Sequence, residues 1–411
     1  MRIERHYGLD WLRVGAFGLL ILYHIGLYFG PWGWHVQTAN PLDWMVYPLF
    51  ATSPWRMTLL FVVSGYATRA LWARSDSSLG FLQSRSLRLL VPLGFGILLI
   101  TPPQGWVELK VAENYAGSYL HYWLVEVLHL APGAVRGAAP TLSHLWFVPY
   151  IWLYATLPIV ASALLPRVVL EKAQALFARM TGWAMLILPL AWLILVRAVI
   201  FPGDMPSNQP FHDLPGHTLY MPAFFFGFAL AAAPNLWPSI MRWGKAGWAM
   251  LGIGYAAILW TERLGARDVL PLSLAEAIER TGYSLMSWGA ILALLALANG
   301  KLNRDGAWRR TLTEAVFPFY IIHQTIIVVV GWYILRFHLH PAAEFAILLA
   351  ATAGGCWAFY LIGREIGWLR PLIGLQPKAE PPEEEPGFAP APPLAPAGRP
   401  LHRPGAPITR G

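Results

Sequence analysis

The sequence predicts an all-α, polytopic membrane protein in which about ten transmembrane helices form one bundle. Hydrophobic residues account for 56% of its 411 residues, and charged residues for only 13%. Apolar stretches near twenty residues recur along the chain, and an α-helix needs about that length to cross a bilayer. Because an ordinary soluble domain does not combine so few charges with such stretches, a soluble fold is excluded. The lipid bilayer is therefore the first expected partner.

The predicted spans begin near residue 10 and follow one another as far as residue 363. Hydropathy places them at residues 10–30, 53–73, 87–103, 143–165, 183–201, 218–234, 246–262, 281–298, 314–336 and 341–363. The first contains an arginine and a histidine, which argues against a cleavable secretory signal. Ser64 and Gly65 in the second span are small residues that permit close helix packing. An even number of crossings places both termini on one side.

Lys and Arg residues gather in alternate loops. The N-terminus, the loops after the second, fourth, sixth and eighth spans, and the segment after the tenth span hold most of them. By the positive-inside rule, both termini are expected in the cytoplasm. The net charge of +8 does not indicate a nucleic-acid partner, because the basic residues are not concentrated on one face.

The chain divides into two regions of different composition. Residues 1–376 form the predicted transmembrane domain. Residues 377–411 are rich in proline and contain three successive glutamates, Glu383–Glu385. Since such a segment cannot form a hydrophobic core, we expect it to be a disordered cytoplasmic tail.

Neither a disulfide nor a metal site is expected. The chain has one cysteine, Cys356, inside an apolar stretch. The histidines expected outside the membrane lack the one-turn spacing with an adjacent carboxylate that zinc enzymes show. A metal hydrolase is therefore disfavoured.

The first span carries two ionisable residues on one face. Ten residues separate Arg13 from His24, and eleven helical steps of ~100° return almost to the starting direction, ~16 Å further along the axis. Ionisable groups at such depth are costly unless they face protein or water, and by default they mark function. Asp10, three residues before Arg13, is expected to pair with it. Asp10, Arg13 and His24 are the candidate catalytic residues; a structural ion pair and a packing histidine are the alternatives.

Arg85 and Arg88 place two guanidinium groups on one helical face directly before the third span. Paired guanidinium groups suit phosphates, because each offers rigid paired donors. Arg13, Arg69 and Arg74 approach the same cytoplasmic rim. The predicted ligand is a polyanionic cytosolic molecule; the alternative is anchoring to lipid headgroups.

Several motifs, in order, resemble those of the integral-membrane acyltransferase-3 family. They are Leu9–Arg13 followed by His24, Leu60–Tyr66, the pair Arg85 and Arg88, and the late histidine segment Tyr320–His323. Within that family, Gly33–Val36, Trp55–Met57 and His144–Phe147 are similar to the periplasmic glucan biosynthesis protein C branch. The resemblance covers roughly residues 8–374 and does not include the proline-rich tail.

The resemblance implies an enzyme of the bacterial inner membrane. It would transfer an acetyl or succinyl group from cytosolic acyl-coenzyme A to a sugar hydroxyl of a periplasmic glucan or envelope polysaccharide, without a resident cofactor. Arg85 and Arg88 would bind the nucleotide end of acyl-coenzyme A, and the thioester would lie near His24. Neutral histidine is suited to act there as general base, or as a nucleophile that forms an acyl-histidine relay. The sequence leaves both routes open.

Five further residues are candidates for acceptor binding. Trp146 would stack on a sugar ring and His144 would donate to a hydroxyl or a developing oxyanion, although aromatic residues also form interfacial belts. Tyr320 and His323 share one face of the ninth span, and either line the polar cavity or bond to a neighbouring helix. His35 is placed near the acceptor entrance.

The main rival function is a transporter or exporter of an anionic or lipid-linked sugar compound, which would also use intramembrane Arg and His. Such a protein typically shows broken spans and related halves. Neither feature is clear in the sequence.

Overall fold

The computed structural model describes residues 5–130 and 141–377. Over these residues the chain is helical and contains no strand. Each of the ten predicted spans lies on a helix: α1 (Tyr7–Phe29), α2 (Val46–Trp72), α3 (Ser78–Phe95), α6 (Phe147–Leu164), α8 (Trp183–Leu195), α9 (Leu214–Leu230), α10 (Trp237–Arg263), α12 (Leu272–Leu297), α13 (Arg309–Leu335) and α14 (Pro341–Glu365). The shorter helices are α4 (Pro102–Ala112), α5 (Tyr119–Tyr122), α7 (Arg167–Ala178), α11 (Ala266–Val269) and α15 (Leu369–Leu372).

The predicted count of about ten crossings is not confirmed. Among the described residues, seven helices are long and apolar enough to cross a membrane, or eight if a bent pair counts as one span. That pair is α9 and the helical segment Pro234–Arg263, which meet at 106°. α3 and α4 also join into one candidate span, Ser78–Ala112. The disordered tail predicted from residue 377 lies, from residue 378 onward, outside the described residues.

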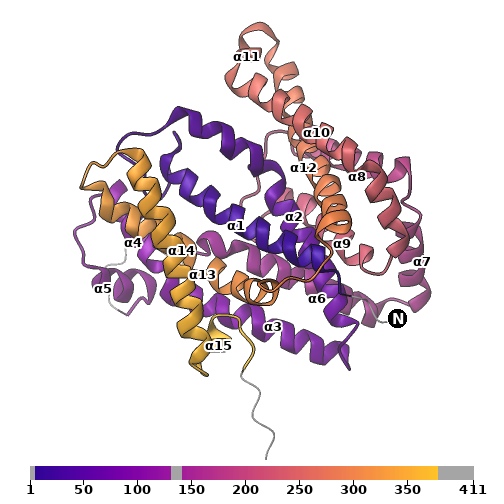
Figure 1. Ribbon diagram of the computed structural model, residues 1–411, viewed down its shortest axis with the longest axis horizontal. Helices are drawn as coiled ribbons and strands as arrows, with labels where there is room; N and C mark the ends of the chain where they lie inside the picture. The colour runs from indigo at the N-terminus through magenta and orange to yellow at the C-terminus, as the bar shows by residue number, and fades with distance from the viewer. Residues whose placement is uncertain (1–4, 131–140, 378–411) are drawn as a thin grey trace, which may run out of the picture. The chain divides into compact units, whose positions relative to one another are not determined.

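Small residues bring several helices into backbone contact. α10 and α12 run side by side with α11 at one end (Figure 1). A Cβ at Gly247 of α10 would crowd the carbonyl of Gly289 in α12. α2 and α9 approach in the same way, since a Cβ at Gly65 would overlap the carbonyl of Phe224. The prediction that Gly65 serves close packing is confirmed.

α1 packs against α2, α13 and α14. Arg13 and His24 each bond to α13, so both side chains face another helix of the bundle. The helix begins after His6, whose Nδ1 accepts a hydrogen bond from the backbone N–H of Leu9 at 3.3 Å. A histidine cap there satisfies one of the free N–H groups that every helix start exposes. α1 is thereby positioned to present Arg13 and His24 to its neighbours.

Four π-helical turns interrupt the regular helices: η2 (Gly96–Ile100), η3 (Trp123–Val127), η5 (Val196–Ile200) and η7 (Ala298–Leu302). A π turn inserts a residue into a helix and is frequently found at functional sites. Here η5 carries a half-buried arginine, Arg197, and η7 packs against α1.

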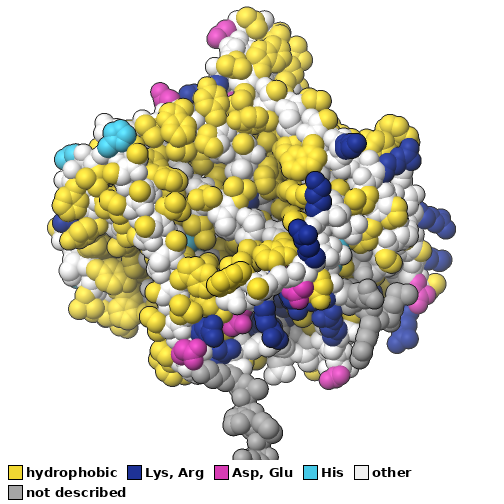
Figure 2. Space-filling view, in the orientation of Figure 1, with side chains coloured by type: hydrophobic (Ala, Val, Ile, Leu, Met, Phe, Trp, Pro, Cys, Tyr) yellow, Lys and Arg dark blue, Asp and Glu magenta, His cyan; other side chains and the backbone are white. Residues whose placement is uncertain are grey.

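The molecular surface is unevenly charged. In Figure 2 most Lys and Arg side chains gather toward the lower and right edges, near the N-terminus, α3 and α7, and hydrophobic side chains cover much of the remaining face. An apolar surface of this extent fits a protein surrounded by lipid.

We expect Gly65→Ala to lower the free energy of unfolding in detergent by about 1–3 kcal/mol, because the added methyl group forces α2 away from α9. Gly18→Ala is the matched control, since nothing lies within 4 Å of a Cβ added at that position of α1. Thermal unfolding followed by circular dichroism measures both. Equal unfolding temperatures for the two variants would contradict the packing described.

Candidate active site

The centre of the site is a hydrogen bond between two histidines. Nδ1 of His24, on α1, lies 2.8 Å from Nε2 of His323, on α13. Nδ1 of His323 lies 2.8 Å from the carbonyl oxygen of Tyr320 and 3.2 Å from that of Phe319. Side chains 299 residues apart in the chain are thus joined at the interface of two helices.

This network assigns the tautomer of both rings. A carbonyl oxygen only accepts, so Nδ1 of His323 carries its proton, and in the neutral ring Nε2 is an acceptor. His24 must therefore donate from Nδ1. Its Nε2 is left with a free lone pair, which is the atom a general base or nucleophile needs.

The surroundings hold the ring of His24 in place without enclosing it completely. The indole of Trp34 lies parallel to it, with ring centroids 6.3 Å apart. His323 is fully buried, whereas His24 retains partial exposure. The imidazole of His24 is consequently the accessible member of the pair.

A polar network extends from this pair across the same end of the bundle. His35 is 2.7 Å from Oε2 of Glu108 through Nδ1, and its Nε2 accepts from the Gln324 side chain at 3.0 Å. Gln324, next to His323 in α13, also donates to Oε1 of Gln104 at 3.0 Å. The network connects the loop after α1 with α4 and α13.

The structure brings His144, Trp146 and Tyr320 to the same end as His24. His144 donates from Nε2 to the carbonyl of Ile321 at 3.0 Å, and the Tyr320 hydroxyl donates to the carbonyl of His144. Both residues therefore join the segment before α6 to α13. Trp146 is partly buried and packs 5.7 Å from the ring of Tyr220.

The predicted arginine cluster lies at the other end of α1. The guanidinium groups of Arg13, Arg85 and Arg88 lie within electrostatic range of one another. Arg13 donates to the carbonyl of Thr313 at 3.3 Å and Arg85 to the Thr68 hydroxyl at 3.4 Å, but the Nε of each is buried without a partner.

In the described part of the chain, none of these three arginines forms an ion pair. Arg85 and Arg88 line a cavity of about 410 Å³, together with Asp76 and the hydroxyls of Ser75, Ser77 and Ser84. The cluster is therefore an open, largely uncompensated cationic site.

The predicted pair between Asp10 and Arg13 is wrong. Asp10 instead pairs with Arg309, at the start of α13, and with Arg5, each at 2.9 Å. Arg309 is also 2.7 Å from Asp305, and its hydrogen bond lowers the pKa of that carboxyl. Asp10 attaches α1 to α13 and forms no ion pair with Arg13, although it lies within electrostatic range of the Arg13 guanidinium.

Two arginines not selected from the sequence also lie in the interior. Arg56 on α2 is only 5% exposed, and its Cζ lies 3.6 Å from the ring centre of Tyr23, the residue before His24. Arg197 in η5 lies 5.7 Å from the ring of Tyr283. Both arginines lie inside apolar stretches of the sequence. The rule that an ionisable residue at such a position marks function, which selected Arg13, therefore selects Arg56 and Arg197 as well.

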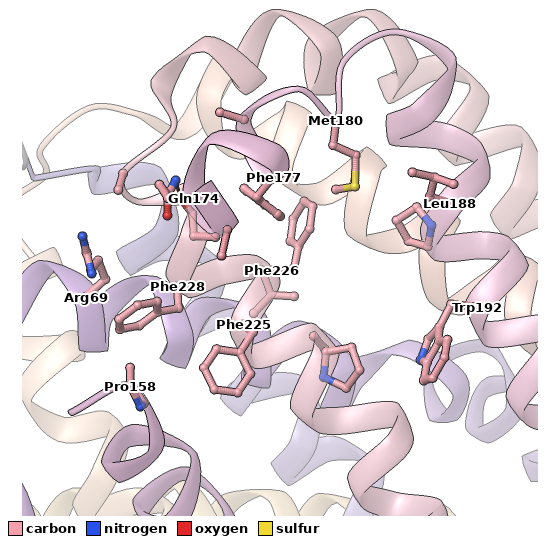
Figure 3. A pocket seen from close by; sticks show the side chains of 18 of the residues that line it. Arg69, Pro158, Gln174, Phe177, Met180, Leu188, Trp192, Phe225, Phe226 and Phe228 are labelled. Atoms are coloured by element: carbon pink, nitrogen blue, oxygen red, sulfur yellow. Dashed lines mark hydrogen bonds between the residues drawn. The ribbon is translucent and has the colours of Figure 1, made fainter. Parts of the chain in front are cut away.

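A separate apolar cavity of about 930 Å³ lies among α7, α8 and α9 (Figure 3). Phe177, Phe225, Phe226 and Trp192 line it, and Arg69 stands at one end beside Phe228. None of the predicted catalytic or acceptor-binding residues lines this cavity. Its walls suit hydrocarbon rather than polar chemistry.

Comparison with known proteins finds similar sequences over most of the chain. The sequence model of a family described as an acyltransferase domain matches residues 6–361. Glucans biosynthesis protein C of Escherichia coli O81 (strain ED1a) is 23% identical over 337 residues, which are 80% of this chain and 84% of that protein. The protein of that name from Salmonella gallinarum (strain 287/91 / NCTC 13346) is 23% identical over 340 residues, with the same shares. No solved structure matches the chain significantly.

The tautomer assignment can be tested directly in protein labelled with ¹⁵N-histidine. At neutral pH, His24 should show the Nδ1–H tautomer, because His323 Nε2 accepts that proton. His323→Ala should remove this bias, whereas His338→Ala, at an exposed position, should not. An Nε2–H tautomer of His24 in the unsubstituted protein would refute the assignment.

Proposed function

The chain belongs to the acyltransferase-3 family, and from that premise we propose that it moves an acetyl or succinyl group from cytosolic acyl-coenzyme A to a hydroxyl of a periplasmic or envelope glycan. One observation carries the proposal: a free imidazole nitrogen, on His24, lies near one end of α1, and guanidinium groups without ion-pair partners lie near the other end. The two relatives are named for glucan biosynthesis, which supports a carbohydrate acceptor.

Arg13, Arg85 and Arg88 are the proposed binding site for the phosphates of coenzyme A. Several phosphate charges would compensate the guanidinium groups that no described carboxylate neutralises. The cavity lined by Arg85 and Arg88 provides room for the nucleotide end. From there the pantetheine arm would follow α1 for ~16 Å, which brings the thioester to His24.

At the thioester, Nε2 of His24 would remove the proton from the acceptor hydroxyl while that oxygen attacks the acyl carbon. The carbon–sulfur bond then breaks, and the coenzyme A sulfur leaves and takes the proton from the imidazolium. In the relay alternative, Nε2 itself attacks and the acyl-imidazole is later intercepted by the sugar. Both routes use the same nitrogen.

His323 would act as a positioning residue in either route. It accepts a hydrogen bond from the Nδ1–H of His24 and so orients the ring. The same bond stabilises positive charge on His24 when Nε2 gains a proton, as the orienting partner of a catalytic histidine does. The carbonyls of Tyr320 and Phe319 fix the orientation of His323 in turn.

The acceptor would enter near His35 and Trp146. His35 is partly exposed and hydrogen-bonded to Glu108, and Trp146 presents an aromatic face that suits a sugar ring. His144 and Tyr320 use their polar groups within the protein, so their proposed role is to hold this wall in place. Asp10 is proposed to hold α1 against α13 through Arg309.

A transporter or exporter of an anionic or lipid-linked sugar compound is the second candidate. The 106° bend between α9 and the following helix favours it, because broken spans are common in transporters. Purified protein in nanodiscs decides between the two when it is given labelled acyl-coenzyme A and a glucan. A transferase releases free thiol and labels the glucan; movement of glycan with intact acyl-coenzyme A would refute the transferase.

We expect His24→Ala to lower kcat by about 10²–10⁴-fold, the usual contribution of a general base. Binding of acyl-coenzyme A should change little, since the phosphates lie at the other end of α1. Turnover by stopped-flow thiol detection and donor affinity by calorimetry measure the two effects. His338→Ala is the control, and a folded His24→Ala protein with full turnover would remove His24 from the mechanism.

Arg85→Ala and Arg88→Ala should each weaken acyl-coenzyme A binding by roughly tenfold or more, because a charge-assisted hydrogen bond contributes about 1.5–3 kcal/mol. The KM for the glucan should stay the same. Arg310→Ala, at an exposed position beside Arg309 at the start of α13, controls for general surface charge. Unchanged donor affinity in both cluster variants would exclude the proposed phosphate site.

A further inference from the structure

Arg56 is buried and Arg197 is half-buried, and the proposed reaction has no role for either cation. Arg56 donates from Nη1 to the Thr52 hydroxyl at 3.2 Å, and the side chain of Tyr23 is a further hydrogen-bond partner. The Nε atoms of both arginines are buried and have no partner. Within residues 5–130 and 141–377, no carboxylate lies within ion-pair distance of either guanidinium group.

The two arginines belong to one cluster. Both lie within electrostatic range of the Tyr220 side chain. The ring of Tyr220 stacks on Phe61 at 4.7 Å and lies 5.7 Å from Trp146. Arg56 also lies within electrostatic range of His24. The cluster is therefore next to the proposed catalytic imidazole and to the proposed acceptor wall.

The nearest acidic groups are already engaged. Asp213 accepts from the Tyr150 hydroxyl at 2.5 Å and from the backbone N–H groups of Ser207, Asn208 and Gly216. Near Tyr283, Glu262 and Glu279 both pair with Arg267, at 2.5 and 2.7 Å. None of these carboxylates is free to neutralise Arg56 or Arg197.

A buried guanidinium without a counter-charge is costly, and protein interiors usually pair it or bind an anion to it. Its planar donors match a carboxylate or phosphate, and the aromatic faces of Tyr23 and Tyr283 support a delocalised cation. The same signature, a buried unpartnered Nε, occurs in Arg13 and Arg85 at the opposite end of α1.

We propose that Arg56 and Arg197 form a second anion-binding subsite beside His24, which takes a carboxylate or phosphate group carried by a substrate. The assignment of the anion to a substrate rests on the proposed function. Two sources supply this chemistry: an acyl group with a free carboxylate, and an anionic substituent on the acceptor glycan. The subsite is separate from the donor phosphate site, because Arg13, Arg85 and Arg88 lie at the other end of α1.

The test compares Arg56→Gln and Arg197→Gln with the control Arg336→Gln. Arg336 also stacks on a tyrosine, 3.8 Å from the ring centre of Tyr333, but it is exposed. The probes are succinate alone, inorganic phosphate alone, acetyl-coenzyme A and succinyl-coenzyme A, each titrated against the full chain in nanodiscs. Calorimetry gives the affinity, and the shift in unfolding temperature gives an independent measure.

In the unsubstituted protein, succinate or phosphate alone should raise the unfolding temperature. Arg56→Gln or Arg197→Gln should abolish the shift with succinate and reduce the shift with phosphate, because phosphate also binds the proposed site of Arg13, Arg85 and Arg88. If the acyl group carries the anion, the variants bind succinyl-coenzyme A at least tenfold more weakly and acetyl-coenzyme A unchanged. If the acceptor carries it, both donors bind as before and KM for an anionic glycan rises at least tenfold over that for its neutral counterpart. Each of these two results supports the subsite and identifies which substrate, the acyl donor or the acceptor glycan, carries the anion.

The proposal is overturned if Arg56→Gln and Arg197→Gln both retain the affinity of the unsubstituted protein for every anionic probe. It is also overturned if both variants unfold at a much lower temperature without any anion, because the arginines would then be structural. A protein that binds succinate or phosphate through Arg56 but does not cleave acyl-coenzyme A would refute the transferase and leave the subsite intact.

Discussion

The contact between α1 and α13 is the constraint on which the rest of the site depends. Two interactions, one near each end of α1, fix this contact. Asp10 pairs with Arg309 at the end near Arg13, and His24 forms a hydrogen bond with His323 near the other end. Since the two contacts lie about four helical turns apart along α1, neither helix can rotate or slide without losing one of them. The free nitrogen of His24 is thus oriented by the same packing that holds the bundle together.

The arginines of the described residues fall into two groups: those that form ion pairs with carboxylates, and those that have no ion-pair partner. Arg267 and Arg280 pair with glutamates at the ends of α10 and α12, where water screens the charges and such pairs contribute little. Arg13, Arg56, Arg85 and Arg197 form no ion pair among the described residues, whereas the buried Arg309 pairs with Asp10 and Asp305. The proposed function assigns Arg13 and Arg85 to the phosphates of coenzyme A, and the proposed subsite assigns a separate anion to Arg56 and Arg197.

Much of the helical architecture was predictable from the sequence, because apolar periodicity is local. All ten predicted segments lie on helices, but α2, which carries Arg56 and Arg69, is not among the candidate membrane spans, so the number of crossings is not confirmed. The spacing of Arg13 and His24 predicted that both residues lie on one face of the first helix. It could not reveal the partner of Asp10, because Arg309 comes from 299 residues away. Nor could it show that His144 uses Nε2 within the protein, since that depends on how α13 packs.

α3, η2 and α4 form one helical stretch of 35 residues, Ser78–Ala112, about 50 Å long at the rise of an α-helix. Near one end it holds Arg85, and near the other Gln104 and Glu108, which bond to Gln324 and His35. The π turn η2 lies within this stretch, so it is not a uniform rod. Under the proposed function, this one segment would carry side chains of both the donor pocket and the sugar entrance, and donor binding and acceptor binding would be thermodynamically linked through it.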